Sequence, residues 1–528
     1  MMRHNAIIVG GGAAGLTAAA FLAKSDRKPL LLEKQAQCGG LINSFTRDGF
    51  TFDGGIRALE NASVMFPMLK SLGIEIEFLK NRVSIGIEDQ VIKVDSSKDL
   101  SAYEALLKSL YPKSADEIAA IVDDIQQITH YMEIQYGIDN PLFLDIRADQ
   151  DYFIKKVFPW MFKYALTVPK VARKDQPVGS YLRQFTKNQS LIDIIAQHFF
   201  TDTPAFFALS YFRLFEDYYY PKIGTGAFIQ KLTEYIQQNG AEIKASTAVT
   251  SVDLAAQTVS TSDGETLPYQ TLLWAADQKT LYQIIDTDAL QDQKVLDSVH
   301  QRRALLKDLL GNDSVFTLYL QTSLDKSYFV SIATAHFFYT PTRQGQSRAG
   351  DPPLEGGWDA VQRWLEEYFA LTTYEISIPV LRNASLAPEG KTGLIISALF
   401  DYPFAKSIQD RGWEERFRSF VTECMINTLD RSIYPGLAAA VEAQFTATPL
   451  TLEKRTGNTE GAITGWSFTN PTIPAENRLI RIANSVRTPL PNVVQAGQWT
   501  YSPSGFPVSL ITGKLAADRI DKLLRKQG

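Results

Sequence analysis

Cysteine and histidine are scarce in this chain of 528 residues. It holds two cysteines, Cys38 and Cys424, and five histidines. Two cysteines that lie far apart in the sequence provide no disulfide framework and no Cys-x-x-Cys redox pair. The histidines show no metal-ligand spacing such as His-Glu-x-x-His. We therefore expect neither disulfide bonds nor a bound metal.

A surplus of basic residues and a long apolar segment are also missing. The formal net charge is −5, which argues against a nucleic-acid partner. No apolar run reaches the roughly 20 residues that a membrane-spanning helix needs. Three glycines interrupt the apolar stretch that follows Arg3 and His4, so we expect no secretory signal. The expected location is the cytoplasm.

What the chain does contain, near its start, is a dinucleotide-binding pattern. An apolar strand at residues 6–9 is followed by Gly-Gly-Gly-Ala-Ala-Gly at 10–15, an apolar helix at 16–24 and a second strand at 29–32. This order of strand, glycines, helix and strand is the start of a Rossmann-type domain. A lone glycine motif would be weak evidence, but here every part occurs in register.

The glycines and the acid that follows them have separate tasks. Gly10 permits the tight turn, Gly12 permits close approach of a pyrophosphate, and Gly15 lets the helix pack closely on the sheet. The helix N-terminus offers unpaired N–H groups to the phosphates. Glu33, which ends the second strand, is placed to accept hydrogen bonds from both ribose hydroxyls. An acid there disfavours a 2′-phosphate, so the pattern predicts FAD or NAD rather than NADP.

The choice between FAD and NAD comes from two further segments. A second glycine pair, Gly39 and Gly40, is followed by Gly-Phe-Thr-Phe-Asp-Gly-Gly-Ile-Arg at residues 49–57. Together with the N-terminal pattern, these segments resemble the phytoene desaturase branch of the FAD-dependent amine-oxidase-like flavoproteins. That branch includes carotenoid desaturases, carotenoid isomerases and retinol saturases. The arginine that commonly follows the glycine pair in this family is Leu41 here, and Arg57 is a candidate to supply the missing charge.

The resemblance continues at distant places in the chain. Tyr-Pro-Lys-Ile-Gly-Thr-Gly at 220–226, Leu-Leu-Trp-Ala-Ala-Asp at 272–277, Val-Val-Gln-Ala-Gly-Gln-Trp at 493–499 and Ser-Gly-Phe-Pro at 504–507 match its later motifs. It implies an α/β fold class with a discontinuous Rossmann-type FAD-binding domain and an inserted α+β substrate, or cap, domain. The FAD-binding domain is expected at 1–75, 220–285 and 480–528. The cap domain is expected at 76–219 and 286–479, with strands such as 315–320, 374–381 and 393–399.

The resemblance also implies that FAD is bound non-covalently by residues from all three segments. Gly497 would admit the ribityl phosphate, and a helix that starts near Val508 would direct its N-terminus at the pyrimidine edge of the flavin, where its dipole stabilises negative charge. The residues expected to contact the cofactor are Gly10, Gly12, Ala13, Ala14, Gly15, Glu33, Lys34, Gly39, Gly40, Leu41, Ile42, Gly55, Ile56, Arg57, Val249, Ala275, Gly497, Gln498, Phe506, Pro507 and Val508.

Candidates for substrate binding and catalysis are fewer. Residues 199–220 are rich in phenylalanine and tyrosine, which suits a tunnel for a long apolar substrate and equally an ordinary aromatic core. Arg57 is the leading catalytic candidate, because its guanidinium can hold a carboxylate or the flavin. A salt bridge between domains, for example to Glu60, is the alternative. Tyr220 is a second catalytic candidate.

A second stretch of the cap bears on where the substrate enters. Residues 152–173 set phenylalanine, isoleucine, tryptophan and leucine among five basic residues. This composition suits a helix that lies on an anionic membrane surface and receives a lipophilic substrate there. It equally suits a cap helix with a solvated basic edge. The first alternative predicts peripheral contact at the inner face of the membrane.

Three classes of function fit the sequence. The preferred one is an FAD-dependent oxidoreductase that transfers hydride between flavin N5 and a C–C bond of a lipophilic polyene or related lipid. A redox-neutral polyene isomerase and a flavin amine oxidase are the enzymatic alternatives, and a flavin-free lipid-binding escort protein is the non-enzymatic one. Because a second glycine-rich motif is missing, we expect an external electron acceptor or donor: a quinone, oxygen or transient NAD(P)H.

Overall fold

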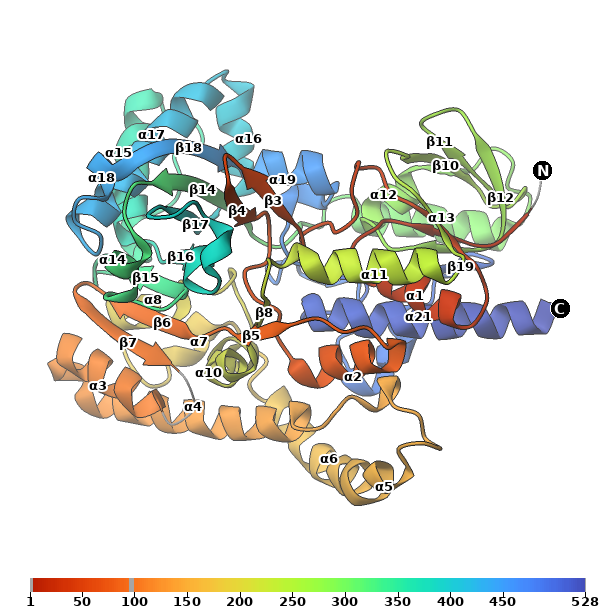
Figure 1. Cartoon of the computed structure of the whole chain (residues 1–528), viewed down its shortest axis with the longest axis horizontal. Coiled ribbons are helices and arrows are strands. Elements are labelled where there is room, and N and C mark those ends of the chain that lie inside the picture. Colours follow the sequence, from red (N-terminus) through yellow and green to blue (C-terminus); the bar gives the residue numbers. More distant parts are fainter. Residues whose placement is uncertain (1–2, 95–98, 528) are drawn as a thin grey trace.

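The N-terminal pattern builds the centre of an eight-stranded sheet. The computed structural model describes residues 3–94 and 99–527 (Figure 1). The strand order is β13-β10-β11-β12-β1-β2-β9, and β19 also pairs with β12. These strands are β1 (His4–Val9), β2 (Leu30–Leu32), β9 (Glu242–Lys244), β10 (Val249–Asp253), β11 (Thr258–Thr261), β12 (Thr266–Trp274), β13 (Ile285–Asp286) and β19 (Val493–Gln495).

Strands from three distant parts of the chain meet in this sheet. β1 is parallel to β2 and β12, β2 is parallel to β9, and β12 is parallel to β19. Central parallel strands are buried on both faces, which is why their sequences are continuously apolar; Ile7 and Ile8 are fully buried. β10, β11 and β12 add an antiparallel meander.

Helices cover both faces of the sheet, as in a doubly wound α/β fold. Ile8 and Leu31 pack against one group, and Ile7 and Leu30 pack against the other. The first group is α1 (Ala13–Lys24), α2 (Ala62–Leu72), α11 (Gly226–Gln238), α20 (Ile482–Ser485) and α21 (Phe506–Gln527), and the second is α12 (Gln278–Gln283) and α13 (Gln293–Leu306). The predicted fold class, with a Rossmann-type α/β core, is confirmed.

A second, seven-stranded sheet lies beside the first (Figure 1). Its order is β18-β14-β17-β16-β15-β6-β7, and its pairs are antiparallel except that of β15 with β6. The strands are β6 (Val83–Ile87), β7 (Gln90–Val94), β14 (Ser314–Thr322), β15 (His336–Thr340), β16 (Tyr374–Ser377), β17 (Thr392–Phe400) and β18 (Val441–Ala447).

Two groups of helices enclose the second sheet. One shares a large aromatic core with β14 to β17, and the other packs on β6 and β7. The first is α14 (Lys326–Val330), α15 (Trp358–Leu371), α16 (Tyr402–Asp410), α17 (Glu414–Arg431) and α18 (Leu437–Ala440), with α19 (Pro449–Thr456) beside them; the second is α3 (Leu100–Leu110), α4 (Ala115–Tyr136), α7 (Val178–Leu182), α8 (Gln189–Ala196), α9 (Ala205–Leu209) and α10 (Tyr211–Leu214).

Two short ribbons connect the sheets. β3 (Ser44–Arg47) pairs with β4 (Phe50–Asp53), and β5 (Phe78–Lys80) pairs with β8 (Tyr219–Pro221). β4 also contacts β17 of the second sheet. The segment that follows β4 therefore runs from one sheet to the other.

α5 (Gln150–Tyr152) and α6 (Phe158–Ala172), joined by the π-helical turn Phe153–Val157, lie at the periphery of the molecule (Figure 1). Within residues 3–94 and 99–527, no helix combines the length and the apolar character needed to cross a bilayer.

Two sequence-based boundaries need correction. The strand expected at 374–381 ends at Ser377, and a 3-10 helix follows at Pro379–Leu381, because Pro379 has no N–H group to continue a strand ladder. The last helix begins at Phe506 rather than near Val508. The limits of the two domains stay a prediction.

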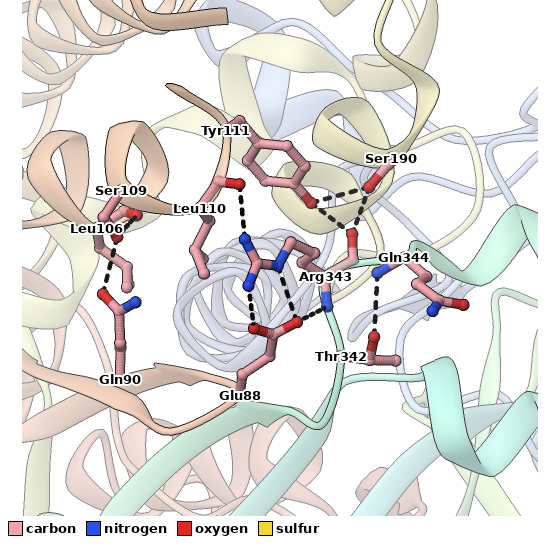
Figure 2. A network of polar contacts seen from close by, with 10 residues as sticks. All are labelled: Glu88, Gln90, Leu106, Ser109, Leu110, Tyr111, Ser190, Thr342, Arg343 and Gln344. Atoms are coloured by element: carbon pink, nitrogen blue, oxygen red, sulfur yellow. Dashed lines mark hydrogen bonds and ion pairs between the residues drawn. The ribbon is translucent and has the colours of Figure 1, made fainter. Parts of the chain in front are cut away.

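A network around Arg343 ties the cap helices to the second sheet (Figure 2). Its guanidinium makes a two-pronged ion pair with Glu88, which precedes β7, at 2.7 and 3.0 Å, and Nη1 donates to the carbonyl of Leu110 at the end of α3 at 2.8 Å. Tyr111 and Ser190 donate their hydroxyls to the Arg343 carbonyl. The hydrogen bonds from Arg343 lower the pKa of Glu88.

We expect Arg343→Met to lower the free energy of unfolding by about 1–2 kcal/mol, because charge-assisted bonds and the contact with the α3 terminus disappear. The matched control is Lys391→Met, which breaks a single, more exposed ion pair with Glu442 and should cost less than about 0.5 kcal/mol. Urea unfolding at pH 7 measures both. Equal costs would show that the Arg343 network does not anchor the cap helices.

Candidate active site

A cavity of about 630 Å³ lies between the two sheets and is lined by residues of both. One end is built by the predicted cofactor-binding segments. The predicted residues that line it are Gly10, Gly12, Ala13, Ala14, Glu33, Gly39, Gly40, Leu41, Ile42, Gly55, Ile56, Arg57, Ala275, Gly497, Gln498 and Phe506. Other predicted residues are not among the described residues that line the cavity: Gly15, Lys34, Val249, Pro507, Val508 and Tyr220.

Gly10, Gly12 and Gly15 of the first motif differ in what surrounds them. A Cβ on Gly15 would lie 1.9 Å from the carbonyl oxygen of Gly10, and one on Gly10, whose φ is +103°, would lie 2.8 Å from that of Ala275. Among the described residues, no heavy atom lies within 4 Å of a Cβ on Gly12. Gly10 and Gly15 are therefore needed for folding, whereas Gly12 leaves open space at the cavity wall.

The first turn of α1 borders this open space. α1 starts at Ala13, directly after Gly12, and its N-terminus has no side-chain cap within the described part of the chain. Its first N–H groups are therefore available for a ligand, and the helix dipole favours negative charge there. Space for a pyrophosphate and donors to hold it occur together, so the cradle fits the dinucleotide that the sequence predicts.

Glu33 lies beside the glycine-rich loop and is hydrogen-bonded to it. Its carboxylate accepts hydrogen bonds from the backbone N–H groups of Gly11 at 2.6 Å and Gln35 at 2.8 Å. The side chain is largely buried, yet it lines the cavity. It lies at the end of β2, and its role in binding a ribose stays a prediction. The neighbouring Lys34 extends away, toward the carbonyl of Lys454.

The C-terminal motif, at residues 493–499, also lies at the start of α1. Gly497 has φ of +99°, and a Cβ on it would lie 3.5 Å from the side chain of Ala14 in α1. Its N–H group donates to the hydroxyl of Thr512 in α21. Residues 272–277 and 493–499 thus converge on the start of α1, although more than 200 residues separate them.

The other end of the cavity combines aromatic and polar side chains. Phe200, Tyr211 and Tyr218 line it, while neighbours such as Phe212 and Phe215 belong to the core of the cap. The aromatic stretch is therefore partly cavity wall and partly core. The polar side chains at this end are Arg57, Glu60, Thr317, His336, Glu375 and Ser397.

Tyr220 is fully buried beneath the site. Its hydroxyl donates to Asp53 at 2.8 Å, and the guanidinium of Arg382 lies 4.3 Å from its ring centre. Burial and the adjacent carboxylate raise its pKa well above the usual value. Tyr220 therefore contributes to the support of the site, and its catalytic role stays a prediction.

Arg57 lies at the junction of the two ends. Its side chain is 5 % exposed, and Nη2 donates to the hydroxyl of Ser397 on β17 at 2.7 Å. Ser397 in turn shares a hydrogen bond of 2.9 Å with Thr317 on β14. Within residues 3–94 and 99–527, Nε of Arg57 has no hydrogen-bond partner and the side chain forms no ion pair with Glu60.

A chain of hydrogen bonds orients Glu375 at the cavity wall. Nε of Arg382 donates to Oδ1 of Asn81 at 2.7 Å, which leaves the Asn81 amide to donate to Nδ1 of His336 at 3.1 Å. Nε2 of His336 therefore carries the ring proton and donates to Glu375 at 3.0 Å. These hydrogen bonds fix a single tautomer of His336.

The pKa directions agree with this tautomer. Burial lowers the pKa of His336, so the ring is neutral. Burial acts to raise the pKa of Glu375, but the hydrogen bond from His336, the electrostatic attraction of that ring and the charges of Arg57 and Arg382 outweigh it, and the net pKa is lowered. A neutral histidine thus donates to an ionised carboxylate.

The sequence analysis did not select His336, Glu375, Asn81 or Arg382. They come from separate strands and loops, and no motif links them. A signal existed for two of them: His336 and Glu375 are polar residues within otherwise apolar strands. The pairing of those strands, which the sequence leaves open, is what makes them neighbours.

Glu60 is a further carboxyl at the cavity wall. It forms no hydrogen bond or ion pair with the described residues, and it lies near Gly505, just before α21. Burial raises the pKa of Glu60 to about 7. The group therefore exchanges a proton near neutral pH, which is the range in which general acids and bases are effective.

Comparisons with known proteins agree with this arrangement. Residues 8–72 match the model of an NAD(P)-binding Rossmann-like domain. The chain is 23 % identical over 473 residues to the chloroplastic prolycopene isomerase of Arabidopsis thaliana, covering 85 % of this chain and 72 % of that protein. It is 21 % identical to a phytoene dehydrogenase of Streptomyces griseus, covering 97 % and 94 %.

Solved structures show the same fold. An oxidoreductase from Methanosarcina mazei superposes with a TM-score of 0.62 at 12 % identity, covering 98 % of this chain and 99 % of that one. Putrescine oxidase superposes with a TM-score of 0.59 at 14 % identity, covering 99 % of both chains. The fold is therefore shared with these solved structures, putrescine oxidase among them. The predicted resemblance to phytoene desaturases and carotenoid isomerases is confirmed by the relatives.

We expect Gly12→Val to abolish dinucleotide binding while leaving the fold intact, because its side chain would occupy the space beside α1, where no described heavy atom lies within 4 Å of the Cβ. Cofactor affinity should fall at least about a hundredfold, whereas urea unfolding of the cofactor-free protein should change by less than about 0.5 kcal/mol. Gly15→Ala is the control and should destabilise the fold itself. Normal cofactor content in Gly12→Val would place the nucleotide elsewhere.

Proposed function

We propose that the protein is an FAD-dependent oxidoreductase that acts on a C–C bond of a lipophilic polyene or related lipid. The observation that carries this proposal is the continuity of one cavity, which joins the nucleotide loop to a wall of aromatic side chains. Flat, rigid aromatic walls suit a long unsaturated chain. The names of the relatives, isomerases and dehydrogenases of carotenoid precursors, support the same substrate class.

FAD is proposed to bind non-covalently along the predicted segments. The N–H groups at the start of α1 hold the pyrophosphate, Glu33 accepts from the ribose, and the turn at Gly497 admits the ribityl chain. When bound, FAD supplies the hydride-transfer chemistry. The chain aligns the substrate, excludes water with its aromatic wall, and holds or releases a proton at the Glu60 carboxyl.

A redox-neutral polyene isomerase is the second candidate, and the prolycopene isomerase relatives favour it. The amine-oxidase alternative is less well supported, because Arg57 and Glu375 occur together at the polar end. Their charges offset one another, and burial raises the pKa of Glu60, the other carboxyl there, so an ammonium group finds no permanently ionised, uncompensated carboxylate. The electron acceptor or donor, whether quinone, oxygen or NAD(P)H, is left to experiment.

Purified protein is expected to be yellow and to release FAD, rather than FMN or NAD, on denaturation. Under anaerobic conditions a long-chain polyene should change the oxidation state of the flavin or be isomerised by the reduced protein, as followed by absorbance and product chromatography. Small amines such as putrescine serve as the comparison. Turnover of amines alone would refute the lipid substrate, and colourless protein that cannot be reconstituted with FAD would refute the oxidoreductase.

We further propose that α6 docks on an anionic membrane surface. Four apolar side chains of this helix, Phe158, Met161, Phe162 and Leu166, are more than half exposed, and their spacing places them on one helix face. Exposed basic side chains surround them: Lys155, Lys156, Lys163, Lys170 and Arg173. Apolar anchors with a basic rim are typical of helices that lie in a membrane interface.

The end of α4 lies between this helix and the cavity wall. Tyr136, at the end of α4, is partly buried, and both Tyr164 of α6 and Glu60 of the cavity wall raise its pKa. Trp160 of α6 also donates its indole N–H to the carbonyl of Ile134 in α4. A lipid taken up beneath α6 would therefore be close to the cavity.

The double variant Phe162→Ser/Leu166→Ser should bind vesicles that contain phosphatidylglycerol at least tenfold more weakly than the wild type, since each buried side chain contributes about 1.5–3 kcal/mol. Co-sedimentation measures this. Leu305→Ser is the control, because Leu305 is an exposed apolar residue on α13, at the opposite side of the molecule (Figure 1). Unchanged vesicle binding by the double variant would show that α6 is a cap helix that does not dock on membranes.

A further inference from the structure

We propose that Arg455 supplies the positive charge that neutralises the cofactor pyrophosphate, in place of the arginine that the resembled family has at the position of Leu41. This inference rests on the proposed function, because it concerns how FAD is held. The charge of a pyrophosphate exceeds the roughly half a unit of positive charge that the N-terminus of α1 offers, so a cationic side chain is needed nearby. Among the described residues that line the cavity, the cations are Arg57 and Arg455.

Arg57 is engaged at the polar end of the cavity. Its Nη2 donates to Ser397 of the second sheet at 2.7 Å. Burial acts to raise the pKa of Glu375, and the charge of Arg57 is among the causes that lower it. A guanidinium whose charge is offset by a carboxylate attracts a phosphate less strongly. The pyrophosphate is therefore left to the other cation, Arg455.

Arg455 lies beside the segment that follows the second glycine pair. Its Nη2 donates to Oδ1 of Asn43 at 2.7 Å, and the amide of Asn43 donates to the carbonyl of Gly40 at 2.8 Å. Its Nη1 is 3.2 Å from the place that a Cβ on Gly54 would take. Within the described part of the chain, Arg455 forms no ion pair. Its guanidinium therefore places an uncompensated charge in the cavity wall that Leu41 also lines.

The second glycine pair connects this charge to the phosphate cradle. Gly39 donates its N–H group to the carbonyl of Gly11 at 2.8 Å, and a Cβ on Gly40 would lie 3.6 Å from Cα of Gly12. The open space at Gly12 thus adjoins the backbone that Asn43 contacts. The N–H groups of α1 and the guanidinium border the same part of the cavity, so both can act on one phosphate group.

Arg455 reaches this place from the opposite side of the cavity. It lies in the last turn of α19, which contacts β14 and β18 of the second sheet. A basic residue in that turn also stabilises the C-terminus of its helix. Lys454 occupies the same turn and is not among the described residues that line the cavity. The two neighbours therefore share any effect on the helix, whereas an effect on the cofactor is expected for Arg455 alone.

The test measures FAD binding to full-length protein from which the cofactor has been removed, by quenching of flavin fluorescence at several salt concentrations. Arg455→Met should weaken binding about tenfold to a hundredfold, because a charge-assisted hydrogen bond to phosphate is lost. Its FAD affinity should also depend less on salt than that of the wild type, since one charge fewer is screened. Lys454→Met should change the affinity by less than about twofold. Urea unfolding of the two cofactor-free variants should be alike.

A double variant moves the charge to the place where the related family carries it. Leu41→Arg/Arg455→Met should bind FAD at least about fivefold more tightly than Arg455→Met and regain the salt dependence. Wild-type affinity or wild-type salt dependence in Arg455→Met, an equal loss in Lys454→Met, or no gain in the double variant would each overturn the role of Arg455 while leaving the FAD-dependent oxidoreductase in place. Failure of the wild type itself to bind FAD would refute the proposed function as well.

Discussion

The close contact between Gly15 of α1 and the carbonyl of Gly10 is the constraint on which the rest of the structure depends. It allows α1 to lie directly on the sheet, and no residue with a Cβ could take the place of Gly15. α11 and α21 then pack against α1, and the turn at Gly497 comes to rest on Ala14. Three distant chain segments are thereby held around the uncapped N-terminus of one helix. The open space at Gly12 results from this packing, so the phosphate cradle and the core of the first sheet have the same physical origin.

The second sheet contributes polar side chains to a cavity that is also lined by aromatic side chains. Thr317, Ser397 and Glu375 lie in a row across β14, β17 and β16, each directly opposite its neighbour. Cross-strand pairing brings their side chains to one face without any local sequence signal. Arg57, in the segment that follows β4 of the connecting ribbon, is hydrogen-bonded to Ser397 of this row. The junction between the two ends of the cavity is thus formed by the ribbon segment and the second sheet.

The nucleotide end of the cavity depends on local motifs, whereas the polar end depends on the pairing of distant strands. This difference explains how much could be predicted from the sequence. The nucleotide end is built from short motifs whose backbone tasks demand glycine or an acid, so most of its residues could be named in advance. Lys34 and Val249 were included because they adjoin such motifs, but a side chain that follows a strand end can point either way, and Lys34 extends toward Lys454. Tyr220 was chosen for its place in a motif, yet its strand directs it to Asp53. His336 and Glu375 could not be found because their proximity depends on strand order, which no local pattern encodes.

The protonation states at the junction connect the geometry to the reaction. Glu375 is tied to a neutral His336 and stays ionised, because its partners stabilise the charge. Glu60 has no such partner within the described residues, and burial raises its pKa to about 7. Two carboxyls on one cavity wall therefore differ in role: one holds a fixed charge that can orient a ligand, and the other changes its protonation near neutral pH. In the proposed function, desaturation removes a hydride from one C–H bond and a proton from the neighbouring carbon, whereas isomerisation through a protonated intermediate adds a proton and then removes it. A carboxyl with the raised pKa of Glu60 suits both reactions, so the difference between a desaturase and an isomerase would lie in the substrate and the electron partner and not in this carboxyl.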